Sequence, residues 1–460
     1  MNPRSQRTQE LVAEDRAHLW HPFSQASEWE SEDALIVERA EGRWLFDTDG
    51  NRYLDGISSL WVNVHGHRHP EVDKAIIRQL GLIAHTTLLG LGSPPSIELA
   101  RRLAGLCPGD LVRVFYSDNG STSVEVALKM AYQYFQQRGR PGDAARTRFI
   151  AFTDAYHGDT VGSVSLGGID LFHGIYKPLL FDALRAPYPY CYRCPLGKAQ
   201  GTCSDACLQR LEEILAVHGS ETAALVIEPL VQGAAGIITA PPGHFRSVAD
   251  MCKRHGVLLI CDEVATGFGR TGTMFACQQE GVVPDFLCLA KGISAGYLPL
   301  AATVTTDEVY DVFRGPYAAH RTFYHGHSYT GNALACAAAI ASLDVFLNEK
   351  VLEGLPDKVQ RLRDRLGERI ASHPNVGDLR QCGLMVGIEL VADRFTKAGL
   401  PLEDRIGRQV ILEARKLGVM IRSLGDVVVL MPPLAITGEE IDFLVDVTAR
   451  SIDAILGRAQ

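Results

Sequence analysis

Features that define membrane, nucleic-acid-binding or fibrous proteins are missing from this sequence. No apolar run approaches the roughly 18 residues of a membrane span, and the N-terminal stretch MNPRSQRTQELVAEDR has no apolar signal core. The formal net charge is −9, whereas a nucleic-acid surface needs clustered Lys and Arg. Tandem repeats and low-complexity tracts are also missing. We therefore expect a cytoplasmic globular protein without membrane or nucleic-acid partners.

The central part of the chain alternates short apolar runs with helical patterns. The runs include RVFYSDNG, RFIAFT, AALVIEPL, GVLLICDEV, FLCLAKG and LAATVTT, all between residues 76 and 344. Strands that are apolar throughout and separated by helices are typical of a mostly parallel sheet covered on both faces. At 460 residues the chain has room for two or three domains. We predict an α/β fold with residues 76–344 as the large domain.

The two ends of the chain have a different pattern. Residues 1–75 contain strand-like pieces, ALIVERAEGRWLFDTDGNRYLDG, followed by a loop rich in Trp and His. After the alanine-rich helical segment NALACAAAIASLDVFL, residues 345–460 combine amphipathic helices with the apolar runs LMVGIELV, GVMIRSLG and VVVLMPP. We predict that residues 345–460 form a smaller α+β domain, which the N-terminal segment joins.

Two charged residues stand at the ends of apolar runs. Asp262 ends the run Val257 to Cys261, and Lys291 follows FLCLA. The carboxyl ends of parallel strands are where open α/β sheets bind ligands. Asp262 alone could be a helix N-cap, and Lys291 alone could be a lysine reaching from a strand end into water. As a pair, a buried lysine amine and a carboxylate suit pyridoxal phosphate, which needs a Schiff-base lysine and an anion at its ring nitrogen.

A third segment, YSDNGSTSVEVALKMA, opens an amphipathic helix with Gly120, Ser121 and Thr122. Backbone N–H groups, the positive end of the helix dipole and two hydroxyls make an anion cradle. Simple N-capping explains the same hydroxyls, and both roles are compatible. Tyr156, in DAYHGDTVGS, could stack on a planar cofactor ring, or it could pack against other side chains without contacting a ligand. The stretch FYHGHSYTGN, residues 323–332, has the small and hydroxyl residues of a second anion contact.

Eleven cysteines are present, and most are scattered singly in apolar runs, where a thiol behaves as a small core residue. We expect no disulfide framework. The exception is YCYRCPLGKAQGTCSDAC, which holds Cys191, Cys194, Cys203 and Cys207 with C-x2-C-x8-C-x3-C spacing. Four thiolates at short spacing suit a structural zinc ion, although zinc ribbons usually place two C-x2-C pairs further apart. An insertion loop with free thiols is the alternative.

Taken together, DEVATGFGRTG, the segment around Lys291 and SDNGSTSVEVALK resemble the class III pyridoxal-phosphate aminotransferases of fold type I. The resemblance runs over nearly the whole chain in the expected order, and it implies a large domain with a mostly parallel, seven-stranded sheet. HLWHPFSQ, SSLWVNVHGHRHPEVD, AYHGDT and IRSLGDVVVLMPPLAIT are similar to the branch that aminates 8-amino-7-oxononanoate to 7,8-diaminononanoate in biotin biosynthesis.

The resemblance implies a role for each matching residue. The catalytic and ring contacts would be Lys291 as Schiff-base lysine, Asp262 at the pyridinium nitrogen and Tyr156 on the ring. The remaining implied contacts are Gly120, Ser121, His327 and Ser328 for the cofactor, with Ser328 reaching the phosphate across a homodimer interface, and Trp61, Phe23, Gly326 and Arg422 for the substrates. Arg422 would take the substrate carboxylate.

Two departures from the branch leave the amino donor open. Members that use S-adenosylmethionine typically have tyrosine at the position of Phe23, and Pro-Thr at His327-Ser328. The segments HGHSYTGN, SSLWVNVHGHR and IAHTTLLG are more similar to the branch that uses L-lysine. The alternatives for the activity are another class III enzyme, such as an ω-aminotransferase or a mutase, and a non-catalytic pyridoxal-phosphate-binding regulator. An assay for 7,8-diaminononanoate distinguishes the predicted activity from that of another class III enzyme. Borohydride fixation of the cofactor on Lys291 distinguishes an enzyme from a non-catalytic regulator.

Overall fold

The computed structural model of the chain describes residues 4–31, 34–199, 202–203 and 205–457. A seven-stranded sheet forms the centre of the larger part, in the order β4-β12-β11-β10-β7-β5-β6. All neighbouring pairs are parallel except those of β12, which runs antiparallel to both β11 and β4. The strands are β4 (Leu111–Ser117), β5 (Arg148–Phe152), β6 (Leu184–Ala186), β7 (Thr222–Ile227), β10 (Leu258–Asp262), β11 (Phe286–Leu289) and β12 (Ala301–Thr306).

Helices cover both faces of this sheet, because alternate residues of each strand are apolar on each side. In β10, for example, Leu259 and Cys261 pack in one core cluster and Ile260 in the other. On the Ile260 side lie α6 (Gly120–Arg138), α7 (Val161–Leu166) and α11 (Asp307–Asp311). On the other side lie α5 (Pro94–Leu106), α9 (Ala206–His218), α10 (His244–His255) and α12 (Ala333–Asn348).

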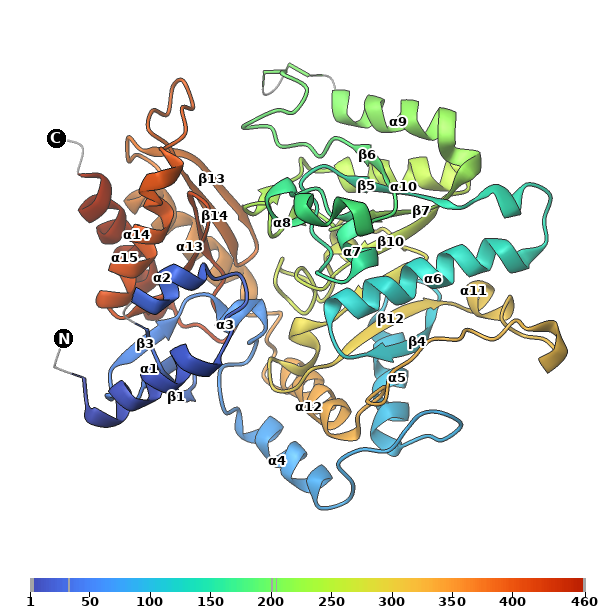
Figure 1. Cartoon of the computed structure of the whole chain (residues 1–460), viewed down its shortest axis with the longest axis horizontal. Coiled ribbons are helices and arrows are strands. Elements are labelled where there is room, and N and C mark those ends of the chain that lie inside the picture. Colours follow the sequence, from blue (N-terminus) through green and yellow to red (C-terminus); the bar gives the residue numbers. More distant parts are fainter. Residues whose placement is uncertain (1–3, 32–33, 200–201, 204, 458–460) are drawn as a thin grey trace.

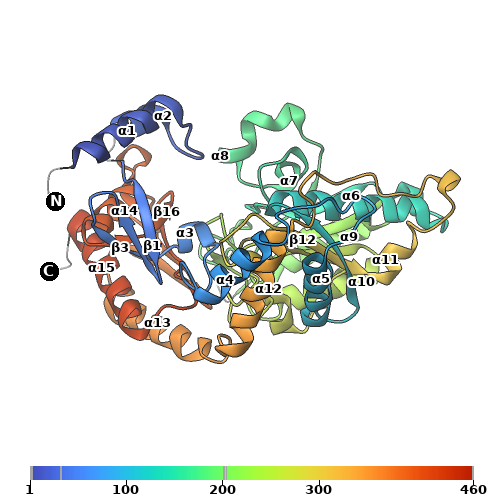
Figure 2. The ribbon, with the colours of Figure 1, turned by 90° about the horizontal axis from the view of Figure 1, so that it is seen from below.

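The smaller part combines both ends of the chain. Strand β3 pairs in parallel with β15, so N-terminal and C-terminal strands share one sheet of order β1-β2-β3-β15. In Figures 1 and 2 the N-terminal elements, in blue, lie beside the C-terminal elements, in red, on the same side of the molecule. The members of this sheet are β1 (Val37–Glu41), β2 (Trp44–Asp47), β3 (Arg52–Asp55) and β15 (Val419–Met420).

A second small sheet, of order β13-β14-β17-β16, is antiparallel throughout. Its strands are β13 (Val376–Cys382), β14 (Met385–Leu390), β16 (Arg422–Leu424) and β17 (Val427–Leu430), and a separate hairpin joins β8 (Val231–Gln232) to β9 (Ile238–Thr239). The remaining helices are α1 (Gln6–His18), α2 (Ala26–Ser31), α3 (Ser58–Trp61), α4 (Pro70–Leu80), α8 (Asp170–His173), α13 (Leu355–Arg369), α14 (Ile406–Lys416) and α15 (Gly438–Leu456).

The predicted α/β architecture with a mostly parallel, seven-stranded sheet is confirmed. The predicted alanine-rich helix is α12, which Asn332 caps by accepting the Ala335 N–H. The domain boundaries at residues 75/76 and 344/345 stay a prediction, and the outermost residues of both end segments, 1–3 and 458–460, lie outside the described residues. No helix of the described ranges has the length and apolar content needed to cross a membrane.

Candidate active site

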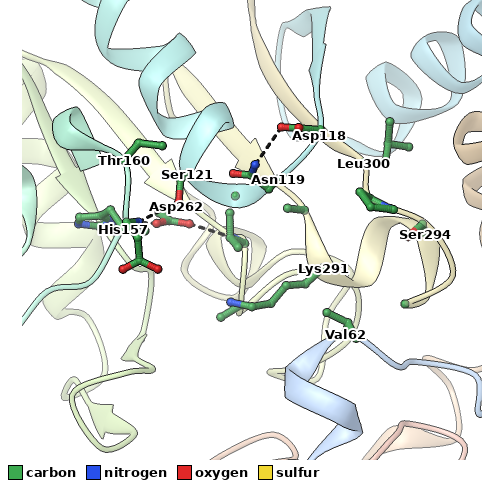
Figure 3. Close-up of a pocket in the computed structure, with 18 of the residues that line it drawn as sticks. Val62, Asp118, Asn119, Ser121, His157, Thr160, Asp262, Lys291, Ser294 and Leu300 are labelled. Atoms are coloured by element: carbon green, nitrogen blue, oxygen red, sulfur yellow. Dashed lines mark hydrogen bonds and ion pairs between the residues drawn. The ribbon is translucent and has the colours of Figure 1, made fainter. Parts of the chain in front are cut away.

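A cavity of about 730 Å³ opens at the carboxyl ends of the parallel strands. Its lining includes Asp262 from the end of β10, Lys291 from the turn after β11 and Ser121 from the start of α6. Figure 3 shows the Lys291 side chain extending beneath Asp262, with His157 and Ser121 on the far side of the carboxylate. Residues predicted separately from three sequence segments therefore converge on one site, as the edge geometry of parallel strands requires.

The local backbone fixes where the Lys291 amine lies. Lys291 begins the 3₁₀ turn η5 (Lys291–Ser294) with a φ of 44°, in the left-handed region. Non-glycine residues adopt that region only where the surrounding structure holds them there. The amine nitrogen Nζ lies 5.1 Å from the centroid of the Trp61 ring. Burial lowers the pKa of Lys291, against the opposing charges of Asp262 and Glu228, and this favours the neutral, nucleophilic amine.

Asp262 is held by a buried histidine that the sequence interpretation did not assign to the site. The side chain of Asp262 is 5% exposed and that of His157 is fully buried. His157 Nδ1 donates to Asp262 Oδ2 at 2.7 Å, and the Val264 N–H donates to Oδ1 at 3.0 Å. The second contact is a local side-chain-to-backbone bond in a turn, similar to the bond that an N-cap aspartate makes. The two donors orient the carboxylate.

The start of α6 lines the cavity with Asn119, Gly120 and Ser121. A Cβ on Gly120 would lie 2.6 Å from Val264 Cγ1, and one on Gly158 would lie 1.9 Å from Ser121 Oγ, so only glycine fits at both positions. Asn119 and Thr122 cap the helix through a reciprocal pair of bonds. The N-cap is therefore Asn119, which accepts the Thr122 N–H while the Thr122 hydroxyl accepts the Asn119 N–H. Ser121 instead lines the cavity, and its hydroxyl accepts the Asp159 N–H at 3.0 Å.

Tyr156 lines the same cavity and is fixed at both its ends. Its hydroxyl donates to Asp159 Oδ2 at 2.8 Å, and its backbone N–H donates to Glu228 Oε1 at 3.3 Å. Burial raises the pKa of the Tyr156 hydroxyl, with Asp159 as the next contribution. The ring is thus a neutral, oriented aromatic surface beside the pocket, compatible with stacking on a planar ligand.

Glu228 is a second carboxylate in the cavity that the sequence interpretation missed. It follows the fully buried strand β7, is 6% exposed, and accepts the Gly233 N–H at 2.8 Å. Burial raises its pKa to about 7, although nearby His157 opposes this shift. The rule that identified Asp262, an acid at the end of an apolar run, identifies Glu228 in AALVIEPL equally well.

Glu228→Gln should make stability less dependent on pH. The folded pKa, about 7, lies above the ordinary 4.5, so the folded protein binds this proton more tightly than the unfolded chain. The Glu228 contribution is therefore present at low pH and lost as pH rises from 4.5 through 7, by up to about 3 kcal/mol. Denaturant unfolding of the cofactor-free protein should show the glutamine variant gaining that amount relative to wild type between about pH 5 and about pH 8. The exposed Glu353→Gln is the matched control, and equal pH slopes for both variants would contradict the prediction.

None of the four predicted substrate residues belongs to the cavity lining. Trp61 lies beside it, with its ring centroid 5.1 Å from the Lys291 amine nitrogen, and it is 8% exposed. Arg422 stands exposed on strand β16 outside the cavity lining, paired through its backbone with Val429, and its guanidinium makes no hydrogen bond or ion pair with any described residue. Phe23 is 61% exposed and packs edge-on against Phe172, with ring centroids 5.5 Å apart, instead of lining the cavity. Phe172 in turn packs edge-on near Tyr156, so the Phe23 segment lies one aromatic ring away from the pocket.

The stretch 323–332 does not contribute to the cavity of its own chain. Gly326, His327 and Ser328 are all outside its lining, and Ser328 is exposed. The Ser328 carbonyl accepts a bond from His85 Nε2 at 2.6 Å, which joins this stretch to the loop between α4 and α5. The His327 ring accepts the Tyr329 N–H at 3.2 Å and thus shapes the local turn.

The four clustered cysteines line a separate cavity of about 190 Å³. All eleven cysteines of the chain are free thiols. Within the described residues, no group of three or more His, Cys, Asp or Glu side chains is already arranged to hold a metal ion. The predicted zinc site is therefore not supported by the positions of the four thiols as they stand.

Comparison with known proteins agrees with this geometry. The family model for class-III aminotransferases matches residues 26–452. An adenosylmethionine-8-amino-7-oxononanoate aminotransferase of Nitratidesulfovibrio vulgaris is 60% identical over 98% of this chain and 82% of its own length. The crystal structure of the enzyme of that name from Methanocaldococcus jannaschii superposes with a TM-score of 0.92 at 43% identity, covering 97% of this chain and 99% of that chain. A PLP-bound amine transaminase from an uncultivated Pseudomonas species superposes with a TM-score of 0.89 at 36% identity, covering 95% and 98%.

Proposed function

Because this chain belongs to the class-III aminotransferases, we propose that it transfers an amino group to 8-amino-7-oxononanoate and so makes 7,8-diaminononanoate for biotin biosynthesis. The observation that carries the proposal is the single cavity that brings together Lys291, Asp262 and the N-terminus of α6. The printed names of the relatives point to the same acceptor and to adenosylmethionine as amino donor. We take adenosylmethionine as the donor on that ground.

The residues of the cavity fit pyridoxal phosphate. A dianion suits the N-terminus of a nineteen-residue helix whose Gly120 leaves no room for a side chain. A protonated ring nitrogen suits the buried Asp262 carboxylate, and an aldehyde carbon suits the Lys291 amine, whose pKa burial lowers. When bound, the cofactor supplies a conjugated ring that accepts the electron pair of a broken C–H bond.

Each residue would act at a defined position. Lys291 would bind the cofactor covalently and carry a proton to and from the reacting carbon, because its neutral amine faces the pocket. Asp262 would hold the proton on the ring nitrogen, and His157, which touches Asp262 and not the ligand, would position that carboxylate. Ser121 and the N–H groups of α6 would bind the phosphate, and Tyr156 would stack against the ring.

The substrate carboxylate would be taken by Arg422. This guanidinium has no partner among the described residues, so binding a carboxylate would satisfy its donors. Trp61 would provide the apolar wall beside the Lys291 amine. Since one pocket must accept the donor and then the acceptor, we expect ping-pong kinetics.

The active form in this proposal is a homodimer. The segment 77–97 exposes large apolar side chains, including Ile77 (68%), Leu82 (80%) and Leu89 (89%). The His85–Ser328 bond places the stretch 323–332 on the same surface, where Tyr324 and Tyr329 are also exposed. A second copy would cover this surface and bring Ser328 of the partner subunit to the cofactor phosphate. A fully active monomer in sedimentation would overturn this part.

The donor experiment tests the proposed reaction directly. Purified enzyme loaded with pyridoxal phosphate should form 7,8-diaminononanoate from 8-amino-7-oxononanoate when S-adenosylmethionine is the donor, with parallel double-reciprocal plots. L-lysine under the same conditions is the comparison, because Phe23 and His327-Ser328 differ from the pattern of the adenosylmethionine-using members. Faster product formation with lysine would replace the donor but keep the reaction. No product with either donor would overturn the reaction itself.

A second candidate activity is that of a general amine transaminase. Two observations favour it. The chain is structurally similar to the PLP-bound amine transaminase, and Phe23 stands where members that use S-adenosylmethionine typically have tyrosine. Turnover of simple amines with pyruvate, without turnover of 8-amino-7-oxononanoate, would identify it. We also propose a cytoplasmic location, in which eleven free cysteines stay reduced.

A further inference from the structure

The turn that carries Trp61 has an unusual backbone. Four consecutive non-glycine residues, Ser58–Trp61, have φ values of 53°, 60°, 149° and 68° and make up the short element α3. Residues other than glycine rarely adopt positive φ, and they stay there only where the surrounding structure holds them. Contacts from outside this left-handed turn must therefore maintain its conformation.

Asp55, at the end of β3, bonds to the left-handed turn twice. Its side chain is completely buried, and Oδ1 accepts the Ser59 N–H at 2.8 Å while Oδ2 accepts the Ser59 hydroxyl at 2.8 Å. His67 Nε2 donates to the same Oδ2 at 2.9 Å. The Ser58 hydroxyl donates to the Met431 carbonyl at 2.7 Å, which ties the turn to the C-terminal part of the chain. The Asp55 carboxylate thus joins Ser59 to His67, on either side of Trp61.

A buried cation fixes the chain just after the turn. Arg270 is 2% exposed, and its guanidinium donates to the carbonyls of Asn63 at 2.5 Å and Pro432 at 2.7 Å. Burial lowers the pKa of Arg270 to about 10, and the charge of Asp55 opposes this shift. Trp61 therefore lies between a residue bonded to Asp55 and a residue bonded to Arg270.

The left-handed turn places Trp61 and Val62 at the candidate active site. Val62 belongs to the cavity lining, and the Trp61 ring lies beside the cavity, 5.1 Å from the Lys291 amine nitrogen. A Cβ on Gly233 would lie 3.1 Å from Trp61 Cζ3, so the indole fits closely against the segment that joins β8 to β9. A change in the backbone of the turn would therefore move this wall of the pocket.

We propose that Asp55 is a positioning residue for amino transfer, which holds the left-handed turn so that Trp61 stays beside the Lys291 amine. This inference rests on the proposed function, because that function makes Trp61 a wall of the substrate pocket. Asp55 is outside the cavity lining, so it acts through the turn and not on a reacting atom. Without the carboxylate, the four residues relax toward negative φ and the indole leaves its position.

Acrylamide quenching of tryptophan fluorescence measures the position of Trp61 in the cofactor-free protein. The chain has four tryptophans, so the Trp61 signal is the difference between each protein and its Trp61→Phe form. In the wild type this signal should resist quenching, because Trp61 is 8% exposed. Asp55→Asn keeps the side-chain shape but puts an N–H donor at Oδ2, where Ser59 and His67 donate, so the Trp61 quenching constant should rise at least about 2-fold.

Asp47→Asn is the matched control for the quenching experiment. Asp47 is a buried aspartate in β2 of the same sheet, and its carboxylate accepts from Asp49, Asn51 and Tyr53. This variant should lose stability but leave the Trp61 signal unchanged. If Asp55→Asn does not fold, Ser59→Ala replaces it, because it removes the hydroxyl bond at an exposed residue. A Trp61 signal as protected as in the wild type, in the folded variant, would overturn the proposal.

Kinetics show whether Asp55 acts through Trp61. Asp55→Asn should lower kcat/KM for amino transfer by about 10-fold, whereas the same change in a Trp61→Ala protein should cost less than about 2-fold. Equal losses in the two backgrounds would indicate a general structural role and would overturn the proposal. A wild type that makes no 7,8-diaminononanoate would overturn the proposed reaction alone, since the quenching result needs no substrate.

Discussion

Lys291→Ala should lower kcat/KM for amino transfer by about 10⁴-fold or more, because the alanine removes both the nucleophile and the proton carrier at one position. The cavity offers no replacement amine, since Lys291 is the only lysine among the described residues of its lining. Product formation from 8-amino-7-oxononanoate measures the loss. Borohydride reduction followed by peptide mass analysis should find the cofactor on Lys291 in the wild type and on no peptide in the variant.

Lys358→Ala is the matched control for this experiment. Lys358 is another lysine whose pKa is lowered by burial, and it donates to the Leu434 carbonyl outside the cavity. The control should keep its activity at temperatures where it is folded, even if its stability falls. Lys291→Ala activity within about 10-fold of wild type would remove Lys291 from the proposed chemistry.

The second large effect is expected for Asp262→Asn, which should lower kcat by about 10² to 10³-fold while KM changes little. Asparagine keeps the shape of the side chain but cannot offer the negative charge that holds a proton on the ring nitrogen. The amide also loses the charge-assisted bond from His157 Nδ1, 2.7 Å from Oδ2. Steady-state kinetics with both substrates measures the two parameters separately.

Two further variants separate the effect of the Asp262 charge from the effect of its orientation. Asp262→Glu restores the charge at a displaced position and should recover part of kcat. His157→Phe leaves the carboxylate in place but removes its orienting donor, so a fall of about 10-fold is expected. If Asp262→Asn binds cofactor normally and works as fast as wild type, the carboxylate has no catalytic role.

Much of the large sheet could be predicted from sequence because its strands are buried on both faces. The apolar parts of AALVIEPL and GVLLICDEV, residues 223–227 and 257–261, coincide with β7 and β10 to within one residue at each end. Strand β6 (Leu184–Ala186) was not identified, because three residues at a sheet edge carry no periodic signal. The antiparallel direction of β12 was also not readable, since an apolar run does not encode its direction.

Site residues that directly follow an apolar strand could be predicted from the sequence. Site residues that only the packing of the fold brings to the cavity could not. Lys291 and Asp262 are each marked by the apolar run before them, and the cavity contains both. His157 sits in a loop, and only the fold brings it within 2.7 Å of Asp262. Ser328 and Gly326 lie outside the cavity of their own chain, so no pattern within one chain could position them.

The parallel pair of β3 and β15 has a consequence for synthesis of the chain. Leu54 pairs with Val419, so the N-terminal strands leave the ribosome long before their partner exists. At about 5–20 residues per second the interval is roughly 20 to 70 s. During that time the β3 side of the β1–β3 meander has an unpaired edge. The N-terminal strands therefore complete their sheet only after translation nears its end, and until then the edge of β3 is open to pairing with other chains.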